Sequence, residues 1–201
     1  MPSRLLVLTD RSQLPAGRSL VEQVKRCIDA GACWVCLRER DLPDDQRLAL
    51  ATSLAGLLRP VGGRLVVAAP LPAAAAWGAV ADGVHLRRSD PVPPHASLVG
   101  RSTHGEAELR AAVEQGCDYV TLSPYAATAS KPGHGPALGP AGLRRVIDAV
   151  PLGETKLLAL GGISSGNAAE AMASGAHGVA VMGEVMRAGD PGRVIRALLP
   201  D

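Results

Sequence analysis

The sequence has few aromatic residues and no long apolar run. Phenylalanine is absent, and two tryptophans and two tyrosines are the only aromatic side chains among 201 residues. No stretch of about 18 apolar residues occurs, which argues against a membrane span. The opening MPSRLLVLTD reaches an aspartate too early for a signal peptide, so we expect the first strand of a cytoplasmic protein there. The length fits a single domain over residues 1–201 with a substantial core.

A strong charge imbalance and a cysteine motif are also missing. The 21 lysines and arginines nearly balance the 19 aspartates and glutamates, which argues against nucleic acid as a partner. Of the four cysteines (Cys27, Cys33, Cys36 and Cys117), only Cys33 and Cys36 have a metal-like spacing. Residues i and i+3 of the strand predicted there face opposite sides. We therefore expect buried free thiols rather than a metal or redox pair.

Short apolar runs alternate with helical patterns along the whole chain. Strands are expected at residues 4–9, 33–37, 64–69, 83–86, 97–100, 118–122, around 158 and at 178–182. Helices are expected at residues 19–30, 44–58, within 70–80, at 106–115 and 140–149, from Ser164 or Ser165, and at 191–199. Strict alternation predicts a parallel sheet. The turn after the first strand has no glycine for a dinucleotide-binding motif. We therefore predict an α/β fold, a single-domain (β/α)8 TIM barrel.

Polar and basic residues follow the predicted strands at the end where barrel enzymes carry their active sites. They are Arg38 and Arg40; Arg87, Arg88 and Asp90; Ser102, Thr103 and His104; Thr128, Ser130, Lys131 and His134; then Gly161, Gly162, Met182 and Gly183. Glycine lets backbone N–H groups approach an anion, and a helix beginning near Ser164 would add its positive end. Together with the basic side chains, these turns predict a site for more than one phosphate.

Several of these residues also have purely structural interpretations. Arg38 and Arg40 could pair with Glu39 and Asp41 on a solvated loop, and the two glycines could form a tight turn that binds nothing. His104 could cap the helix that follows it or pair locally at the start of that helix. His85 lies within a strand, where a packing role is the simpler expectation.

The order and spacing of six segments resemble the thiamine phosphate synthase superfamily, which also includes the thiazole tautomerases. The segments are VLTDR, LRERDL, ADGVHLRRSD, LVGRSTHGEAE, CDYVTLSPYAATASKPG and LALGGISSGNAAEAMASGAHGVAVM, from Leu6 to about Met186. The synthases condense hydroxymethylpyrimidine pyrophosphate with hydroxyethylthiazole phosphate, and Mg²⁺ helps pyrophosphate to leave. The resemblance thus implies small phosphorylated substrates.

The resemblance also implies roles for individual residues. Arg38, Arg40 and Lys131 would hold pyrophosphate, Asp90 would bind Mg²⁺, and Ser102 matches the serine of strand five. The phosphate of the thiazole would lie against Thr128, Ser130, Gly161, Gly162, Met182 and Gly183. His104 or His134 could supply an imidazole for proton transfer.

Three departures from the synthase pattern keep other functions open. Synthases carry a second acidic metal ligand after strand three, where this chain has Val67–Leu71 without a carboxylate. Cys36 replaces a glutamine, and Arg87 and Arg88 replace Gly-Gln. Losing one of two carboxylates would weaken Mg²⁺ binding, and the added arginines could act as fixed cations instead.

The missing carboxylate favours a metal-independent tautomerase acting on thiazole phosphate. Against this, the position of the tautomerases' catalytic histidine is Pro124 here. The leading hypothesis is a synthase; the alternatives are a tautomerase and a non-catalytic binder or regulator that retains the thiazole phosphate site. A homo-oligomer is compatible with each.

Overall fold

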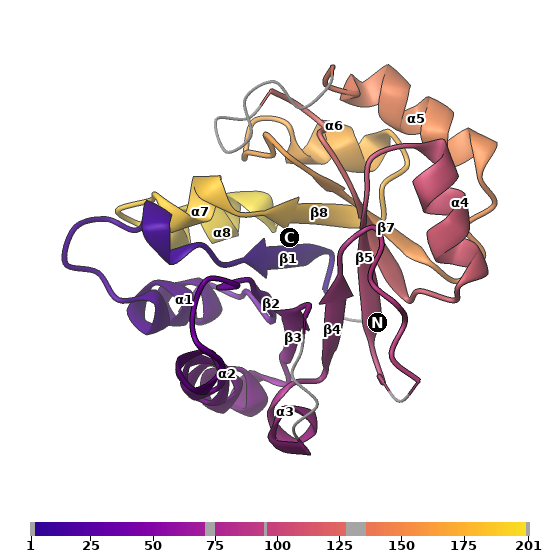
Figure 1. The fold of residues 1–201 in the computed structure, drawn as a ribbon. Helices are drawn as coiled ribbons and strands as arrows, with labels where there is room; N and C mark the ends of the chain where they lie inside the picture. The colour runs from indigo at the N-terminus through magenta and orange to yellow at the C-terminus, as the bar shows by residue number, and fades with distance from the viewer. Residues whose placement is uncertain (1–2, 71–74, 95, 128–135, 200–201) are drawn as a thin grey trace.

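Eight parallel strands pair in chain order and close into a barrel, with β8 beside β1 (Figure 1). The computed structural model describes residues 3–70, 75–94, 96–127 and 136–199. In these ranges the strands are β1 (Leu5–Leu8), β2 (Trp34–Leu37), β3 (Arg64–Ala68), β4 (Gly83–Leu86), β5 (Val99–Thr103), β6 (Tyr119–Leu122), β7 (Lys156–Leu160) and β8 (Gly178–Val181). Leu5 pairs with Val179 where the ring closes. The predicted (β/α)8 barrel is confirmed.

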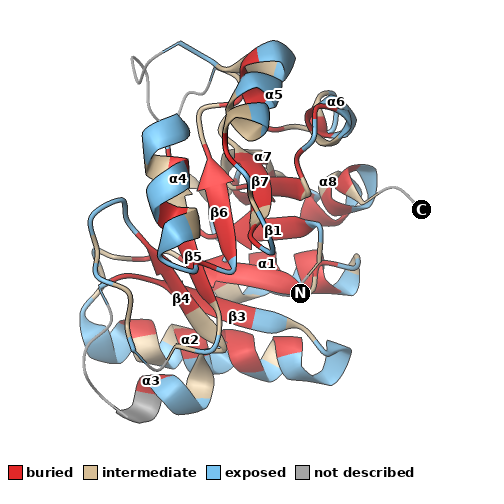
Figure 2. Ribbon diagram, turned by 90° about the vertical axis from the view of Figure 1, so that its right-hand side faces the viewer, coloured by how far each residue is buried: buried red, intermediate tan, exposed pale blue. Residues whose placement is uncertain are grey.

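Helices surround the barrel and turn their buried sides toward the strands (Figure 2). They are α1 (Leu20–Asp29), α2 (Asp44–Leu58), α3 (Ala75–Val80), α4 (Glu106–Glu114), α5 (Gly139–Ala149), α6 (Ala168–Ala173), α7 (Gly183–Met186) and α8 (Pro191–Leu198), with 3-10 turns η1 (Arg11–Gln13) and η2 (Arg59–Val61). Side-chain caps define some of the starts. The Ser19 hydroxyl accepts a hydrogen bond from the N–H of Glu22, and the Asp190 carboxylate accepts one from the N–H of Arg193.

Two predicted elements have wrong boundaries, and one helix was not predicted. β5 was expected at residues 97–100 but runs from Val99 to Thr103, because Ser102 and Thr103 continue the pairing with β6. Arg101, Ser102 and Thr103 are therefore strand residues rather than loop residues. The helix expected from Ser164 or Ser165 begins at Ala168, after a turn closed by Asn167. The short helix α7 had no counterpart in the prediction.

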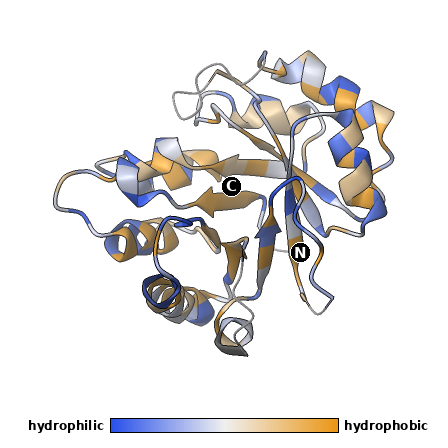
Figure 3. Cartoon of the chain, in the orientation of Figure 1, coloured by the Kyte–Doolittle hydropathy of each residue, from blue (hydrophilic) through white to orange (hydrophobic). Residues whose placement is uncertain are grey.

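The barrel has two separate apolar layers. The outer layer lies between strands and helices, whose apolar and polar faces are visible in Figure 3. The inner layer fills the barrel and consists of Leu6, Leu8, Trp34, Cys36, Val66, Ala68, Tyr119, Leu158 and Ala180. Trp34 and Tyr119 meet edge to face with their ring centres 4.7 Å apart. Half of the chain's four aromatic residues thus occupy the barrel centre.

Gly100 is the residue that makes room for the Tyr119 ring. A Cβ built on Gly100 would overlap the ring atoms of Tyr119. The aromatic ring therefore lies across the backbone of β5, which any larger residue at position 100 would prevent.

The remaining expectations about cysteines and membranes can be compared with the described residues. All four cysteines are free; Cys27, Cys36 and Cys117 are buried, whereas Cys33 is only partly buried. No helix in the described ranges is both long enough and apolar enough to cross a membrane.

Candidate active site

A cavity of about 500 Å³ opens at the carboxyl end of the barrel. It is large enough for a small-molecule ligand. Ten predicted site residues line it: Arg38, Arg40, Arg87, Arg88, Ser102, His104, Gly161, Gly162, Met182 and Gly183. Sequence positions far apart therefore meet at one mouth, as the barrel prediction required. Thr128, Ser130, Lys131 and His134 lie outside the described residues.

The lining of the cavity is strongly basic. Among the described residues, its lining contains one acidic side chain, Glu184, and five arginines: Arg38, Arg40, Arg87, Arg88 and Arg187. Burial lowers the pKa of the Arg40 guanidinium, and the charges of Arg87 and Arg38 lower it further. The Nε of Arg40 is buried and has no hydrogen-bond partner in the described part of the chain. Such a cluster is suited to an anionic ligand.

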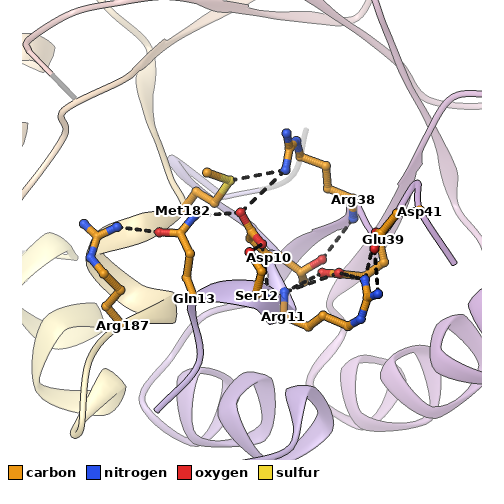
Figure 4. A network of polar contacts seen from close by, with 10 residues as sticks. Asp10, Arg11, Ser12, Gln13, Arg38, Glu39, Asp41, Met182 and Arg187 are labelled. Atoms are coloured by element: carbon orange, nitrogen blue, oxygen red, sulfur yellow. Dashed lines mark hydrogen bonds and ion pairs between the residues drawn. The ribbon is translucent and has the colours of Figure 1, made fainter. Parts of the chain in front are cut away.

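The interpretation of Arg38 and Arg40 as loop ion pairs is not supported, because Arg11 binds the neighbouring acids. Arg11 Nη1 lies 3.0 Å from a carboxylate oxygen of Glu39, and Arg11 Nη2 lies 2.6 Å from one of Asp41 (Figure 4). Arg38 instead donates to the Met182 sulfur at 3.8 Å and lies 3.8 Å from Asp10. These contacts hold the Arg38 guanidinium between β2 and the end of β8.

Asp10 is itself part of a polar chain that reaches α7. Gln13 donates a hydrogen bond to Asp10 at 2.6 Å and accepts one from Arg187 (Figure 4). Asp10 and Gln13 thus connect two arginines of the cavity lining, Arg38 and Arg187. Their guanidinium positions are therefore set by packing as well as by charge.

His85 lies at the floor of the cavity between two hydroxyl groups. Its Nδ1 is 3.0 Å from the Tyr119 hydroxyl, and its Nε2 is 2.9 Å from Ser102 Oγ. Burial lowers the pKa of His85 to about 3, helped by the charges of Arg40, Arg38 and Arg101. Burial also raises the pKa of Tyr119 well above its usual value, so the phenol stays protonated.

The packing role expected for His85 is therefore incomplete, since its ring also lines the cavity and orients Ser102. The alternation of residues in this strand could have predicted that His85 faces the barrel interior. The apolar Val84 and Leu86 flank His85 and belong to the outer layer, which leaves His85 facing the barrel interior.

The double glycine after β7 forms a turn on the opposite side of the cavity. Gly161 and Gly162 have φ angles of 91° and 65°, a conformation that side chains other than hydrogen disfavour. The carbonyls of Leu160 and Gly161 accept hydrogen bonds from Tyr125 and Ala126. The N–H groups of Gly161 and Gly162 have no acceptor within the described residues. The backbone thus offers donors to a ligand, although α6 begins too late and is too short to add the expected helix end.

Comparison with known proteins agrees with this arrangement. A family model described as thiamine monophosphate synthase matches residues 5–185. The chain belongs to this family. A putative thiamine-phosphate synthase of Geobacter sulfurreducens is 36% identical, with 97% of this chain and 92% of that protein covered. A thiamine-phosphate synthase of Methanoculleus marisnigri is 35% identical, with 96% of this chain and 92% of that protein covered.

A solved structure supports the same family. A thiamine phosphate pyrophosphorylase from Pyrococcus furiosus matches with a TM-score of 0.80 at 27% identity, covering 96% of this chain and 92% of that one. The resemblance drawn from the sequence is confirmed.

The thiamine monophosphate synthase resemblance predicts a metal ligand at Asp90, which the structure places outside the cavity lining. Asp90 Oδ2 accepts a hydrogen bond from the N–H of Arg87 at 2.8 Å and lies 4.0 Å from Arg87 Nε. No group of three or more His, Cys, Asp or Glu residues in the described ranges could hold a metal ion together. The end of β3, residues 67–70, carries no carboxylate that could join Asp90 in the two-carboxylate Mg²⁺ site that the resemblance implies. The role of Asp90 stays a prediction.

His104 lies at the rim of the cavity and is engaged with the helix that follows it. The ring Nδ1 of His104 is 3.0 Å from Glu108 Oε2, and the backbone N–H of His104 donates a hydrogen bond to the same oxygen at 2.9 Å. Glu108 also lies 3.2 Å from Arg88 Nη1. These contacts agree with local pairing at the helix start rather than with capping, because the N-cap of α4 is Gly105 and no side chain caps it. The proposed proton transfer by His104 stays a prediction.

Proposed function

We propose that this chain is a thiamine-phosphate synthase. It would condense hydroxymethylpyrimidine pyrophosphate with hydroxyethylthiazole phosphate to give thiamine phosphate and pyrophosphate. The observation that carries the proposal is the pairing of an arginine cluster and a glycine turn across one cavity. A reaction of two phosphorylated substrates needs two separate anion sites, and this cavity offers two.

The proposed reaction requires stabilisation of the negative charge on the leaving group and does not require a strong base. The ring nitrogen of the thiazole forms a bond to the methylene carbon of the pyrimidine with its own electron pair. The bond from that carbon to oxygen breaks, and pyrophosphate leaves with the other pair. Arg38 and Arg40 would stabilise the negative charge that develops on the leaving group. The glycine turn would hold the phosphate of the thiazole, so that the two reacting atoms stay close together.

Ser102 is the polar group best placed for the pyrimidine. Because His85 is neutral, one of its ring nitrogens donates a hydrogen bond and the other accepts one. If the Tyr119 hydroxyl donates to Nδ1, then Nε2 donates to Ser102 Oγ, and the Ser102 hydroxyl hydrogen is free to reach a ring nitrogen of the substrate. We therefore assign Ser102 to substrate binding and His85 to positioning Ser102.

The test is a reconstitution with purified protein. Incubation with both substrates should yield thiamine phosphate and pyrophosphate in equal amounts, detected by chromatography. Ser102→Ala should raise KM for the pyrimidine substrate, while Ser97→Ala, on the loop before β5, should leave it unchanged. Conversion of one thiazole phosphate isomer into another without the pyrimidine would instead identify a tautomerase. Thiazole phosphate binding in calorimetry with no turnover would identify a non-catalytic binder.

A further inference from the structure

Two buried arginines occupy the ends of β3 and β4, where the family resemblance expects acidic metal ligands. Arg47 on α2 is 2% exposed and donates hydrogen bonds to the backbone carbonyls of Ala68 and, at 2.8 Å, Pro70. Arg101 on β5 is 4% exposed and donates to the carbonyls of Arg87 and Arg88, both at 2.8 Å. Backbone oxygens that could face a cation are thus already bound by guanidinium groups.

Carboxylates do not neutralise these two buried charges. In the described part of the chain, neither Arg47 nor Arg101 forms an ion pair. Of the nearby acids, Asp90 binds the backbone of Arg87 and Glu108 pairs with Arg88. Asp44 acts on Arg47 only through its charge, which opposes the lowering of the Arg47 pKa by burial. This end of the barrel therefore carries an excess of positive charge, and a divalent cation entering it would be repelled.

Arg101 also fixes the loop that brings more cations to the cavity. Its second terminal nitrogen donates to the carbonyl of Asp90 at 2.8 Å, so three carbonyls of one loop are held by one side chain. That loop carries Arg87 and Arg88 into the cavity lining beside Arg38 and Arg40. The Nε atoms of Arg40, Arg47 and Arg101 are buried donors that lack an acceptor among the described residues, and of these three arginines Arg40 alone lines the cavity. A buried guanidinium donor is costly unless a ligand oxygen satisfies it.

We propose that this side of the cavity binds the pyrophosphate group directly through Arg38, Arg40, Arg87 and Arg88, without a divalent cation. The inference rests on the proposed function for the identity of the anion and departs from the Mg²⁺ expected from the family. Guanidinium groups bind pairs of phosphate oxygens with planar, two-point geometry, so fixed arginines can replace the charge that a metal would supply. Arg101 is a positioning residue in this arrangement, because it holds the loop that carries Arg87 and Arg88.

Calorimetry with inorganic pyrophosphate tests the proposal on the whole chain and needs no turnover. Binding should be measurable in EDTA, and excess Mg²⁺ should weaken it because the metal complexes free pyrophosphate. Arg40→Gln should weaken binding in EDTA by about tenfold or more, as expected for a lost charged hydrogen bond. Arg88→Gln, at a side chain that is 72% exposed, should also weaken binding without affecting the fold. Arg193→Gln on α8 removes an equal charge outside the cavity and should change binding by less than about twofold.

Binding that requires Mg²⁺, no binding in either buffer, or equal binding by wild type, Arg40→Gln and Arg88→Gln would each overturn the proposal. The synthase assignment is separable from this result. Pyrophosphate binding in EDTA without formation of thiamine phosphate from both substrates would sustain the anion site and reject the synthase activity. Product formed only when Mg²⁺ is present would sustain the synthase and reject the metal-free site.

Discussion

The Nε2 atom of His85 lies 2.9 Å from Ser102 Oγ, which joins a buried ring to a hydroxyl that lines the cavity. The other ring nitrogen lies 3.0 Å from the Tyr119 hydroxyl. Three polar groups from β4, β5 and β6 therefore satisfy one another inside an otherwise apolar barrel. Such a buried network costs stability when one member is removed and its neighbours stay.

Replacing His85 with phenylalanine should lower the free energy of unfolding by about 1–3 kcal/mol, because the Tyr119 hydroxyl loses its partner in a buried site. Tyr119→Phe in the same chain should recover part of this loss, since both polar partners are then gone. Denaturant unfolding of the single and double variants measures the effect. A double variant less stable than His85→Phe by the full cost of Tyr119→Phe alone would contradict the coupling.

The pH dependence of stability should also report on His85. The pKa of His85 is about 3 in the folded chain, compared with 6.5 for an ordinary histidine. Between these values the unfolded chain binds a proton at this position and the folded chain does not. Stability should therefore fall as pH decreases from about 6.5 toward 3, by up to about 1.4 kcal/mol per pH unit for this group.

The matched variant for this measurement is His85→Phe, which should show a shallower decrease over the same pH range. The comparison is needed because burial also lowers the pKa of His177, which contributes in the same direction in both proteins. Parallel stability curves for wild type and His85→Phe would show that the imidazole does not titrate as described.

Gly100→Ala should destabilise the barrel, because the new Cβ would overlap the Tyr119 ring. Overpacking of this kind costs about 1–3 kcal/mol. Gly56→Ala on α2 is the control: its Cβ meets nothing within 4 Å, and the change should stabilise the helix by about 0.5–1 kcal/mol. Thermal unfolding should thus shift in opposite directions for the two alanines. A Tm for Gly100→Ala equal to that of wild type would mean that Tyr119 can move without cost.

The sequence was sufficient for the barrel because short apolar runs alternate with helical patterns along the whole chain. The helix predicted at residues 44–58 and the strand at 83–86 have those same bounds in the structure. The placement of Arg38, Arg40 and the glycine turn at one mouth followed from the rule that strand ends converge in a barrel. At these positions the local sequence pattern and the barrel fold specify the same structure.

The sequence was insufficient where a residue's role depends on distant segments. β5 was placed too early because its carboxyl end is polar, and only the cavity beside it explains a strand that contains Ser102. The sequence places Arg47 in the helix predicted at residues 44–58 and gives no partner for it. In the structure its guanidinium donates hydrogen bonds to the backbone carbonyls of Ala68 and Pro70 at the end of β3. Arg101 lies beyond the strand predicted at residues 97–100, although it is a buried residue of β5 that holds the preceding loop in place. Such contacts link separate elements, and no periodicity predicts them.

Gly162→Ala should weaken binding of hydroxyethylthiazole phosphate if the turn after β7 holds its phosphate. The φ angle of 65° strains an alanine, and its Cβ would lie 2.5 Å from the carbonyl oxygen of Ala127. Relief of that contact would move the backbone N–H groups away from the ligand, so we expect a loss of about tenfold or more, equivalent to about 1.4 kcal/mol. Gly166→Ala is the control, since its Cβ meets only Ser164 Oγ at 3.7 Å. Calorimetry on both variants measures the affinity for hydroxyethylthiazole phosphate, and circular dichroism verifies that both are folded. Equal affinities would place the phosphate of the thiazole elsewhere in the cavity.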